Sequence, residues 1–163
     1  MLTHPNVKHD LIYHDLIYLA QAYTHVDPKV RQDRYEYACG AVAYYALKNI
    51  PVFSPIVHWH EVSKRFNLPH DIDFWETQCL STLSRCTRLH LLQRDNWQAS
   101  NGVFFELKHA LSLSIPVYVI TCFNDFANPK LVHTPSIIKK MNSHGKDNSE
   151  RGPYRDYLKP VDD

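Results

Sequence analysis

Four short apolar runs constrain the fold of this chain more than any other feature of its sequence. They lie at residues 15–20, 51–55, 89–92 and 116–120. Short runs that are mostly apolar are typical of parallel strands whose two faces are both covered. The longer segments between them must then supply the helices that provide this cover, because parallel strands need crossover connections. The sequence therefore predicts alternating strands and helices.

The segments between the predicted strands show the three- and four-residue spacing of amphipathic helices. The clearest signal is Asp27-Pro28, an N-cap followed by proline at the first helical position, and Asn49 is the expected stop of that helix. Regular alternation with right-handed crossovers favours one α/β domain, a doubly wound, flavodoxin- or Rossmann-like parallel sheet of four or five strands with helices on both faces. The predicted helices run from Asp27 to Lys48, from Asp71 or Asp73 to Leu83, and up to Leu113.

The remaining segments show no clear periodicity. Residues 56–70, after the proline that we expect to end the second strand, are predicted to form a loop rich in His and Trp. Residues 124–135 are rich in turn formers, and one or two helical turns are expected at 136–141. The predicted organisation is a polar leader at 1–14, the α/β domain at 15–122 and a partly irregular C-terminal extension at 123–163.

The charge balance argues against large anionic partners. Eighteen Lys and Arg against seventeen Asp and Glu leave a formal charge of +1, so the long-range field of a nucleic-acid or membrane binder is absent. No apolar run approaches the roughly 20 residues of a bilayer span, and the first ten residues are not signal-like. The four cysteines lack C-x-x-C spacing and are expected to be reduced core thiols. A cytoplasmic protein with a small-molecule partner is predicted.

No metal site and no cofactor are predicted. The sequence holds eleven histidines but no H-E-x-x-H or similar ligand cluster. His58 and His60 flank Trp59, and such an i, i+2 pair points to opposite sides of a strand. Trp59 and His60 either line the opposite wall of a binding site together with His58 or, as we expect, belong to a loop packed on the domain surface.

The strongest concentration of site chemistry lies at the junction between the third strand and the following helix. Ser100, Gly102 and Glu106 place a hydroxyl, exposed backbone N–H groups and a carboxylate close together there. Ligands of open α/β sheets bind beyond the carboxyl ends of strands, and helix N-termini favour anions. A lone helical glutamate is usually solvated, but this context favours a functional carboxylate that can attack an anomeric carbon.

An ordered set of motifs resembles the nucleoside 2-deoxyribosyltransferase superfamily, and most closely its small phage and bacterial members. The resemblance spans about residues 16–120 and implies the same fold. The motifs, in chain order, are Tyr18-Leu19-Ala20, Tyr23-Thr24-His25, Asp27-Pro28, Arg34-Tyr35, Ser54-Pro55-Ile56 with His58, Trp75, Trp97, Ser100, Gly102-Val103 and Glu106.

The resemblance implies that Glu106 is a nucleophile that attacks C1′ of a deoxyribosyl group and releases the base. A serine at position 100 resembles the 2′-deoxynucleoside 5′-monophosphate N-glycosidases, whereas the base-exchanging transferases carry aspartate there. It therefore implies a nucleotide substrate with water as the acceptor. The implied substrate-binding residues are Tyr18, Gln21, Tyr23, Thr24 (as a phosphate contact), His25, Ser54, His58, Trp97, Ser100 and Gly102.

Three features of the sequence depart from the superfamily pattern. Gln78-Cys79 occupies the place after Trp75 where relatives carry an acidic residue, Thr87 follows Cys86 where they carry aspartate, and Ala22 replaces a proline. A protein that binds or sequesters a nucleotide without cleaving it, as in phage counter-defence within a host cytoplasm, is therefore a second hypothesis. A nucleoside 2-deoxyribosyltransferase is a third.

Two side chains keep alternative roles, and an oligomer is expected. Trp97 either stacks on a base or covers a strand end, and Arg34 reaches a phosphate or, as we expect, pairs with Asp33 or Glu36. Superfamily members are typically dimers or larger. A homodimer or higher homo-oligomer is predicted, with the tyrosine-rich helix at 35–45 as its interface.

Overall fold

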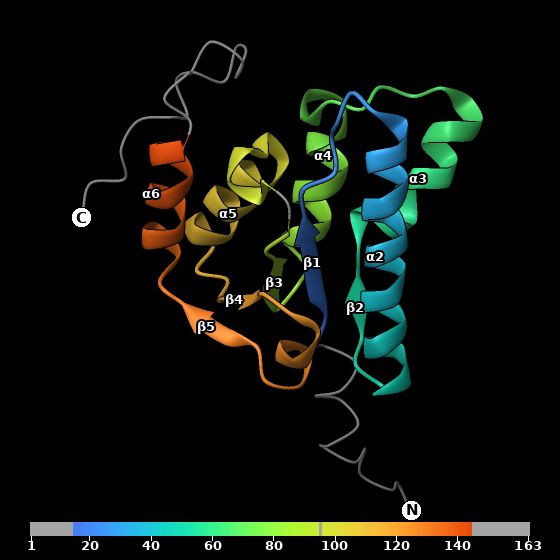
Figure 1. Cartoon of the computed structure of the whole chain (residues 1–163). Coiled ribbons are helices and arrows are strands. Elements are labelled where there is room, and N and C mark those ends of the chain that lie inside the picture. The colour runs from blue at the N-terminus through green and yellow to red at the C-terminus, as the bar shows by residue number, and fades with distance from the viewer. Residues whose placement is uncertain (1–14, 95, 145–163) are drawn as a thin grey trace, which may run out of the picture.

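The computed structural model describes residues 15–94 and 96–144 and contains one five-stranded sheet with the order β2-β1-β3-β4-β5 (Figure 1). The predicted single α/β domain with a mostly parallel sheet is confirmed. The polar leader predicted at 1–14 lies outside the described residues. The strands are β1 (Ile17–Gln21), β2 (Val52–Phe53), β3 (Arg88–Leu92), β4 (Val117–Ile120) and β5 (Lys130–Val132).

The first four strands are parallel, and β5 runs antiparallel to β4. In the central pair Tyr18 lies opposite Leu89, and Leu89 lies opposite Val117 on the next strand. Gln21, expected in the following loop, is the last residue of β1. The helical elements are α2 (Pro28–Leu47), α3 (Pro55–Phe66), α4 (Ile72–Leu83), η1 (Trp97–Ala99), α5 (Asn101–Ser112), η2 (Phe123–Ala127) and α6 (Thr134–His144).

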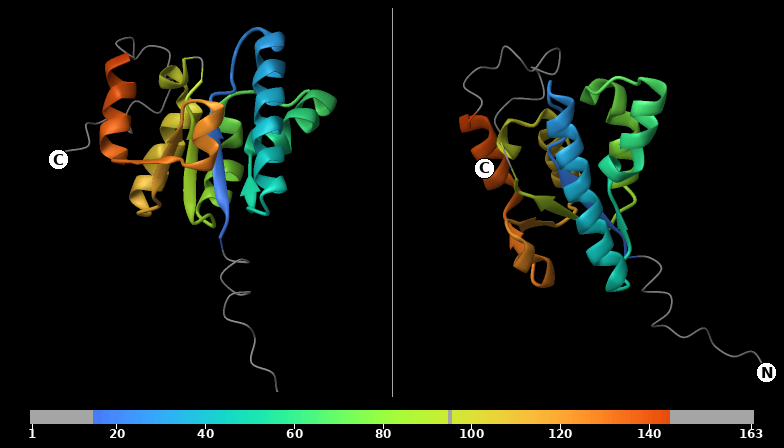
Figure 2. Two further views of the ribbon diagram at one scale, coloured as in Figure 1. Left: turned by 60° about the horizontal axis from the view of Figure 1, so that its bottom comes forward. Right: turned by 45° about the vertical axis from the view of Figure 1, so that its right-hand side comes forward.

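Successive residues of β1 point into two different cores, as the two-residue period of a strand requires. Ile17 and Leu19 pack with Ala41 and Tyr45 of α2 on one face. Tyr18 and Ala20 pack on the other face with residues of α4, α5 and α6. Figure 2 shows α2 separated from α5 and α6 by the sheet. Helices on both faces were predicted and are observed.

The caps predicted for α2 are confirmed. The Asp27 carboxylate accepts from the backbone N–H of Lys29 at 2.8 Å, and Pro28 is the first helical residue. The helix ends at Leu47, and Asn49 follows with a φ of 58°. Asparagine tolerates this left-handed conformation better than most residues, which explains why the helix stops there.

The loop predicted at residues 56–70 is wrong, because most of this segment forms α3. The Ser54 hydroxyl caps the helix by accepting from the backbone N–H of Val57 at 3.3 Å, and Pro55 is its first residue rather than the end of a strand. Two of its four buried residues are His60 and Ser63. Half of this buried face is polar, and the proline that begins the helix is also a residue that ends strands, so the local pattern favours a strand end followed by a loop.

The turn-rich segment expected at 124–135 contains a strand, β5, at the edge of the sheet. A three-residue edge strand whose Leu131 is mostly exposed carries no alternating pattern. The following helix, α6, is longer than the one or two turns expected, and its Ile137, Ile138 and Met141 are buried in the main core. The chain after residue 122 is therefore part of the same folded unit as far as residue 144.

None of the helices in the described part of the chain is both long and apolar enough to cross a membrane.

Candidate functional site

A pocket of about 580 Å³ opens at the carboxyl ends of β1 and β3. The chain leaves β1 toward β2 on one side and later returns to β3 on the other, so this is the point where the strand order reverses and where ligands of such sheets bind. Its lining residues are Gln21, Tyr23, Thr24, Pro55, Ile56, Trp59, His60, Ser63, His70, Asp71, Ile72, Trp75, Cys79, Ser100, Gly102 and Glu106.

Glu106 is the buried carboxyl group of this pocket. Its side chain is 5% exposed, and the buried Tyr18 hydroxyl donates to its Oε1 at 2.6 Å. Burial raises the pKa of Glu106 to about 8, although the hydrogen bond from Tyr18 acts in the opposite direction. Burial, followed by the nearby charge of Glu106, raises the pKa of the Cys79 thiol to about 12. The site therefore combines one titratable carboxyl with a thiol that stays protonated.

The N-terminus of α5 forms one edge of the pocket. Ser100 is the N-cap, and its hydroxyl accepts from the backbone N–H of Val103 at 3.3 Å. Gly102 lies in the first turn, whose N–H groups have no acceptor within the helix. A Cβ at Gly102 would meet only ordinary contacts, 3.8 Å from the Ser100 Oγ and 3.9 Å from the Ile72 Cδ1. The predicted grouping of Ser100, Gly102 and Glu106 is observed, at the pocket.

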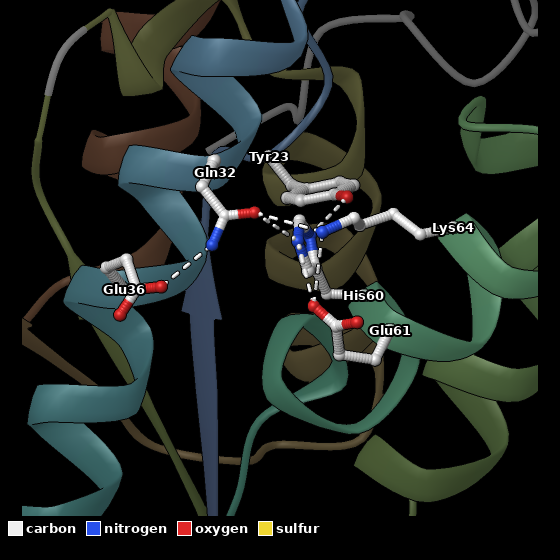
Figure 3. A network of polar contacts seen from close by, with 6 residues as sticks. All are labelled: Tyr23, Gln32, Glu36, His60, Glu61 and Lys64. Atoms are coloured by element: carbon white, nitrogen blue, oxygen red, sulfur yellow. Dashed lines mark hydrogen bonds and ion pairs between the residues drawn. The ribbon is translucent and has the colours of Figure 1, made fainter.

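The loop after β1 and α3 form a polar wall of the pocket (Figure 3). The Tyr23 hydroxyl lies 2.8 Å from His60 Nδ1, and His60 Nε2 lies 3.0 Å from Gln32 Oε1. The ring of Tyr35 stacks on His60 with its centroid 4.1 Å away. The placement of His60 in a surface loop is wrong: its side chain is 3% exposed and lines the pocket. Burial lowers the pKa of His60, so the imidazole is neutral at pH 7.

The aromatic wall of the pocket comes from α3 and α4. The rings of Trp59 and Trp75 lie 5.1 Å apart, and both line the pocket beside Ile56 and Ile72. The Trp75 indole N–H donates to the Pro69 carbonyl at 2.7 Å, which fixes that ring. Trp59 is therefore a wall residue, and the surface-loop prediction is wrong for it too.

Two further residues at the base of the loop after β1 are tied to α2. The Gln21 amide donates to the Arg34 carbonyl at 3.1 Å, and the Arg34 guanidinium donates to the carbonyls of Tyr23 and Thr24 at 3.2 and 2.9 Å. Arg34 thus holds the loop after β1 through its backbone carbonyls. The sequence predicted an ion pair with Asp33 or Glu36 for this residue and did not predict this role. The Thr24 hydroxyl lines the pocket but donates to the His70 carbonyl at 2.8 Å.

Five residues implied by the resemblance do not line the pocket. Tyr18 is fully buried and contacts Glu106 through its hydroxyl. His25 accepts from the backbone N–H of Asp27 at 3.0 Å, and His58 is exposed beside the Trp59 ring. Ser54 is the cap of α3, and Trp97, 7% exposed, packs in the main core rather than against a ligand. Of the two roles considered for Trp97, cover of the strand end is the one observed.

Asp71 is a pocket residue that the sequence pattern did not place. It caps α4, where its Oδ1 accepts from the backbone N–H of Phe74 at 3.1 Å, and it also lines the pocket. The sequence predicts Asp71 as a possible N-cap. It does not predict that α4, the helix that Asp71 caps, packs against α5, the helix of Glu106. An acidic side chain is thus present at the pocket although Gln78-Cys79 replaces the expected one.

The tyrosines of α2 are used within the chain. Tyr45 is buried, Tyr35 stacks on His60, and Tyr44 packs 5.2 Å from the Phe126 ring. The Arg94 guanidinium lies 3.9 Å from the centre of the Tyr37 ring. The excess of aromatic surface that suggested an interface on this helix is therefore accounted for, and the homo-oligomer stays a prediction.

Within residues 15–94 and 96–144 no group of three or more His, Cys, Asp or Glu side chains is arranged to hold a metal ion.

A comparison with protein families matches residues 12–122 to a family model described as "Domain of unknown function (DUF1937)". No curated protein matches the chain.

Proposed function

The chain belongs to the DUF1937 family, whose function is unknown, and we propose that it is an N-glycosidase that cleaves the bond between base and sugar in a 2′-deoxynucleoside 5′-monophosphate. One observation carries this proposal. The buried carboxyl of Glu106, held by the Tyr18 hydroxyl, lies in a pocket with a helix N-terminus and an aromatic wall. A carboxylate can attack a sugar carbon, a helix N-terminus can bind a phosphate, and an aromatic wall can stack on a base.

In the proposed reaction the Glu106 carboxylate attacks C1′ of the deoxyribose. The C1′–O bond to Glu106 forms as the C1′–N bond breaks, and the base leaves with the bonding electrons and takes up a proton from solvent, which the attacking water returns in the second step. Water then attacks C1′ of the glycosyl ester, which releases 2-deoxyribose 5-phosphate and regenerates the carboxylate. The Tyr18 hydroxyl stabilises the ionised form of Glu106 before attack and after hydrolysis.

The pocket offers different chemistry at its two sides. Ser100 and Gly102 at the start of α5 suit the 5′-phosphate, because free N–H groups and the helix dipole favour an anion. Trp59 and Trp75 suit the base, since stacking on an aromatic ring contributes about 1–3 kcal/mol per base. Figure 1 shows α5 and α3 on either side of α4. Glu106 lines the same pocket as these two groups.

A nucleotide-binding or sequestering protein is the second candidate. It is favoured by the raised pKa of Glu106, about 8, since a carboxyl that is mostly protonated at pH 7 is a weak nucleophile. Cys79, next to Glu106, also replaces the acidic residue that orients the sugar in the resembling enzymes. Transfer of deoxyribose to a second base is a third candidate that differs only in the acceptor.

One experiment separates the three candidates. The protein is incubated with each 2′-deoxynucleoside 5′-monophosphate, and the products are resolved by chromatography. Free base with 2-deoxyribose 5-phosphate supports hydrolysis, and a new nucleotide formed after addition of a second free base supports transfer. Stoichiometric binding with the ligand returned intact sinks the enzyme proposal and favours sequestration.

The pH dependence of the reaction follows from the pKa of Glu106. Only the carboxylate attacks, so kcat/KM is expected to rise about tenfold per pH unit and to level off near pH 8. Tyr18→Phe removes a hydrogen bond that lowers this pKa, so the midpoint should move to higher pH. Measurement between pH 6.5 and 9.5 avoids most of the titration of the substrate phosphate, near 6.

Tyr118→Phe, on β4 and outside the pocket, is the matched control and should leave the profile in place. A flat wild-type profile over this range would show that ionisation of Glu106 does not limit the reaction.

Phosphate recognition is tested by Ser100→Asp. Aspartate caps a helix as well as serine, so the melting temperature is expected to stay within a few degrees of wild type. The new carboxylate faces the proposed phosphate position, so affinity for a deoxynucleoside monophosphate should fall at least about tenfold. Affinity for the corresponding nucleoside should not fall, and calorimetry with both ligands makes the comparison. Equal losses for both ligands would place the phosphate elsewhere.

A further inference from the structure

The polar contacts behind Tyr23 determine where its hydroxyl proton lies (Figure 3). The first link is the side-chain amide of Gln32. Its Nε2 lies 2.7 Å from the Glu36 carboxylate, which only accepts, and its Oε1 lies 3.4 Å from the Lys64 ammonium, which only donates. If the amide were flipped, its oxygen would face the Glu36 carboxylate and its nitrogen would face the Lys64 ammonium. Gln32 therefore presents its oxygen to His60.

The second link is the imidazole of His60. Since Gln32 presents an acceptor 3.0 Å from Nε2, this nitrogen carries the ring proton. Burial keeps the ring neutral by lowering its pKa, with the Lys64 charge acting in the same direction and Glu61 against it. Nδ1 is then a bare acceptor, 2.8 Å from the Tyr23 hydroxyl. Tyr35, stacked on the imidazole, holds the ring in this plane.

The third link is Tyr23, whose single proton is committed to His60. The Arg31 guanidinium, which only donates, hydrogen-bonds to the same oxygen. Toward a ligand in the pocket the Tyr23 oxygen therefore offers its remaining lone pair and no proton. Gln21, also at the pocket, uses its Nε2 to donate to the Arg34 carbonyl. Its side-chain oxygen is thereby identified as an acceptor, and within the described residues this buried atom has no hydrogen-bond partner.

We infer that the pocket selects nucleotides whose base carries an exocyclic amino group, which donates to Tyr23 Oη and Gln21 Oε1. This inference rests on the proposed nucleotide substrate. Gln21 is the last residue of β1, and Tyr23 lies in the loop that follows. Tyr23 contacts His60 of α3, and the same helix supplies Trp59 to the aromatic wall. A base with a carbonyl at the same position would set acceptor against acceptor and leave buried groups unpaired, which is costly.

Matched nucleotide pairs test this selection. dAMP and dIMP, like dCMP and dUMP, differ at one exocyclic group and the adjacent ring nitrogen. Dissociation constants are measured by calorimetry with Glu106→Gln, and kcat/KM by competition with the wild-type protein. The pocket is expected to prefer either purines or pyrimidines. Within the preferred pair, the nucleotide with the amino group should bind at least about tenfold more tightly than the one with the carbonyl. Equal affinities within both pairs, or a preference for the carbonyl member, would overturn the inference.

Tyr23→Phe should reduce the preference for the amino member to less than about threefold, because it removes one of the two acceptors and the hydroxyl that His60 orients. Tyr35→Phe is the matched control: it keeps the ring stacked on His60 and should keep the full preference. An unchanged preference in Tyr23→Phe overturns the role of this residue.

The outcomes also separate the inference from the proposed function. Selective binding without cleavage defeats hydrolysis and supports the inference. Cleavage of all four nucleotides at equal rates supports hydrolysis and defeats the inference, whereas failure to bind any of the four defeats both.

Discussion

Glu106→Gln is expected to lower base release by at least about a thousandfold while the protein still binds its nucleotide. Loss of the group that forms a covalent intermediate typically costs several orders of magnitude in rate. Glutamine has nearly the same shape, and its amide oxygen can still accept from the Tyr18 hydroxyl, so the pocket should remain intact. The rate is measured as free base formed in a single turnover, and binding is measured by calorimetry.

Glu76→Gln is the matched control, since it makes the same chemical change on α4 at a residue that does not line the pocket. It should leave the rate within about twofold of wild type. Full activity in Glu106→Gln would remove this residue from the mechanism. Loss of binding in the same variant would instead indicate that the carboxyl holds the ligand.

The same substitution is expected to stabilise the protein at alkaline pH. Burial raises the folded-state pKa of Glu106 from 4.5 to about 8, so the folded state binds this proton more tightly than the unfolded state. The stability linked to that proton is fully present below the unfolded pKa and is lost as pH rises toward 8. At 1.36 kcal/mol per pKa unit the loss is on the order of 5 kcal/mol. Glutamine carries no such penalty.

Urea denaturation at pH 4 and pH 9 measures the effect. The free energies of unfolding of wild type and Glu106→Gln should agree within about 1 kcal/mol at pH 4, where the buried carboxyl is neutral in both states. At pH 9 the variant should be the more stable by several kcal/mol. Glu76→Gln should show no such divergence. If the two curves run parallel across this range, the carboxyl is not held in its neutral form by burial.

The elements with strong local signals were predictable from the sequence. The Asp27-Pro28 cap, the Asn49 stop and the apolar runs of the parallel strands each follow from the chemistry of a few neighbouring residues. α3 and β5 were not predictable in this way. The buried face of α3 includes a serine and a histidine, and the histidine's partners lie on other elements. β5 is a short edge strand with an exposed leucine.

The site residues that lie together at the junction between β3 and α5 were predictable from the sequence. The site residues that depend on tertiary contacts were not. Ser100, Gly102 and Glu106 lie in one segment, so their grouping followed from the start of α5. The choice of His58 over His60 depended on a helix that had not been recognised. Residues two apart on a helix point about 200° apart, so only one of the pair can face the pocket, and it is His60.

The burial of α6 has a consequence for what the DUF1937 family match represents. The match ends at residue 122, yet Ile138 and Met141, at most 1% exposed, lie in the same core as Val103 and Leu107 of α5, the helix that carries Glu106. The stretch recognised by sequence similarity is therefore shorter than the stretch that packs around this core. A fragment cut at the family boundary removes α6 from the core that it shares with α5, the helix of Glu106, so functional work needs a chain that includes α6.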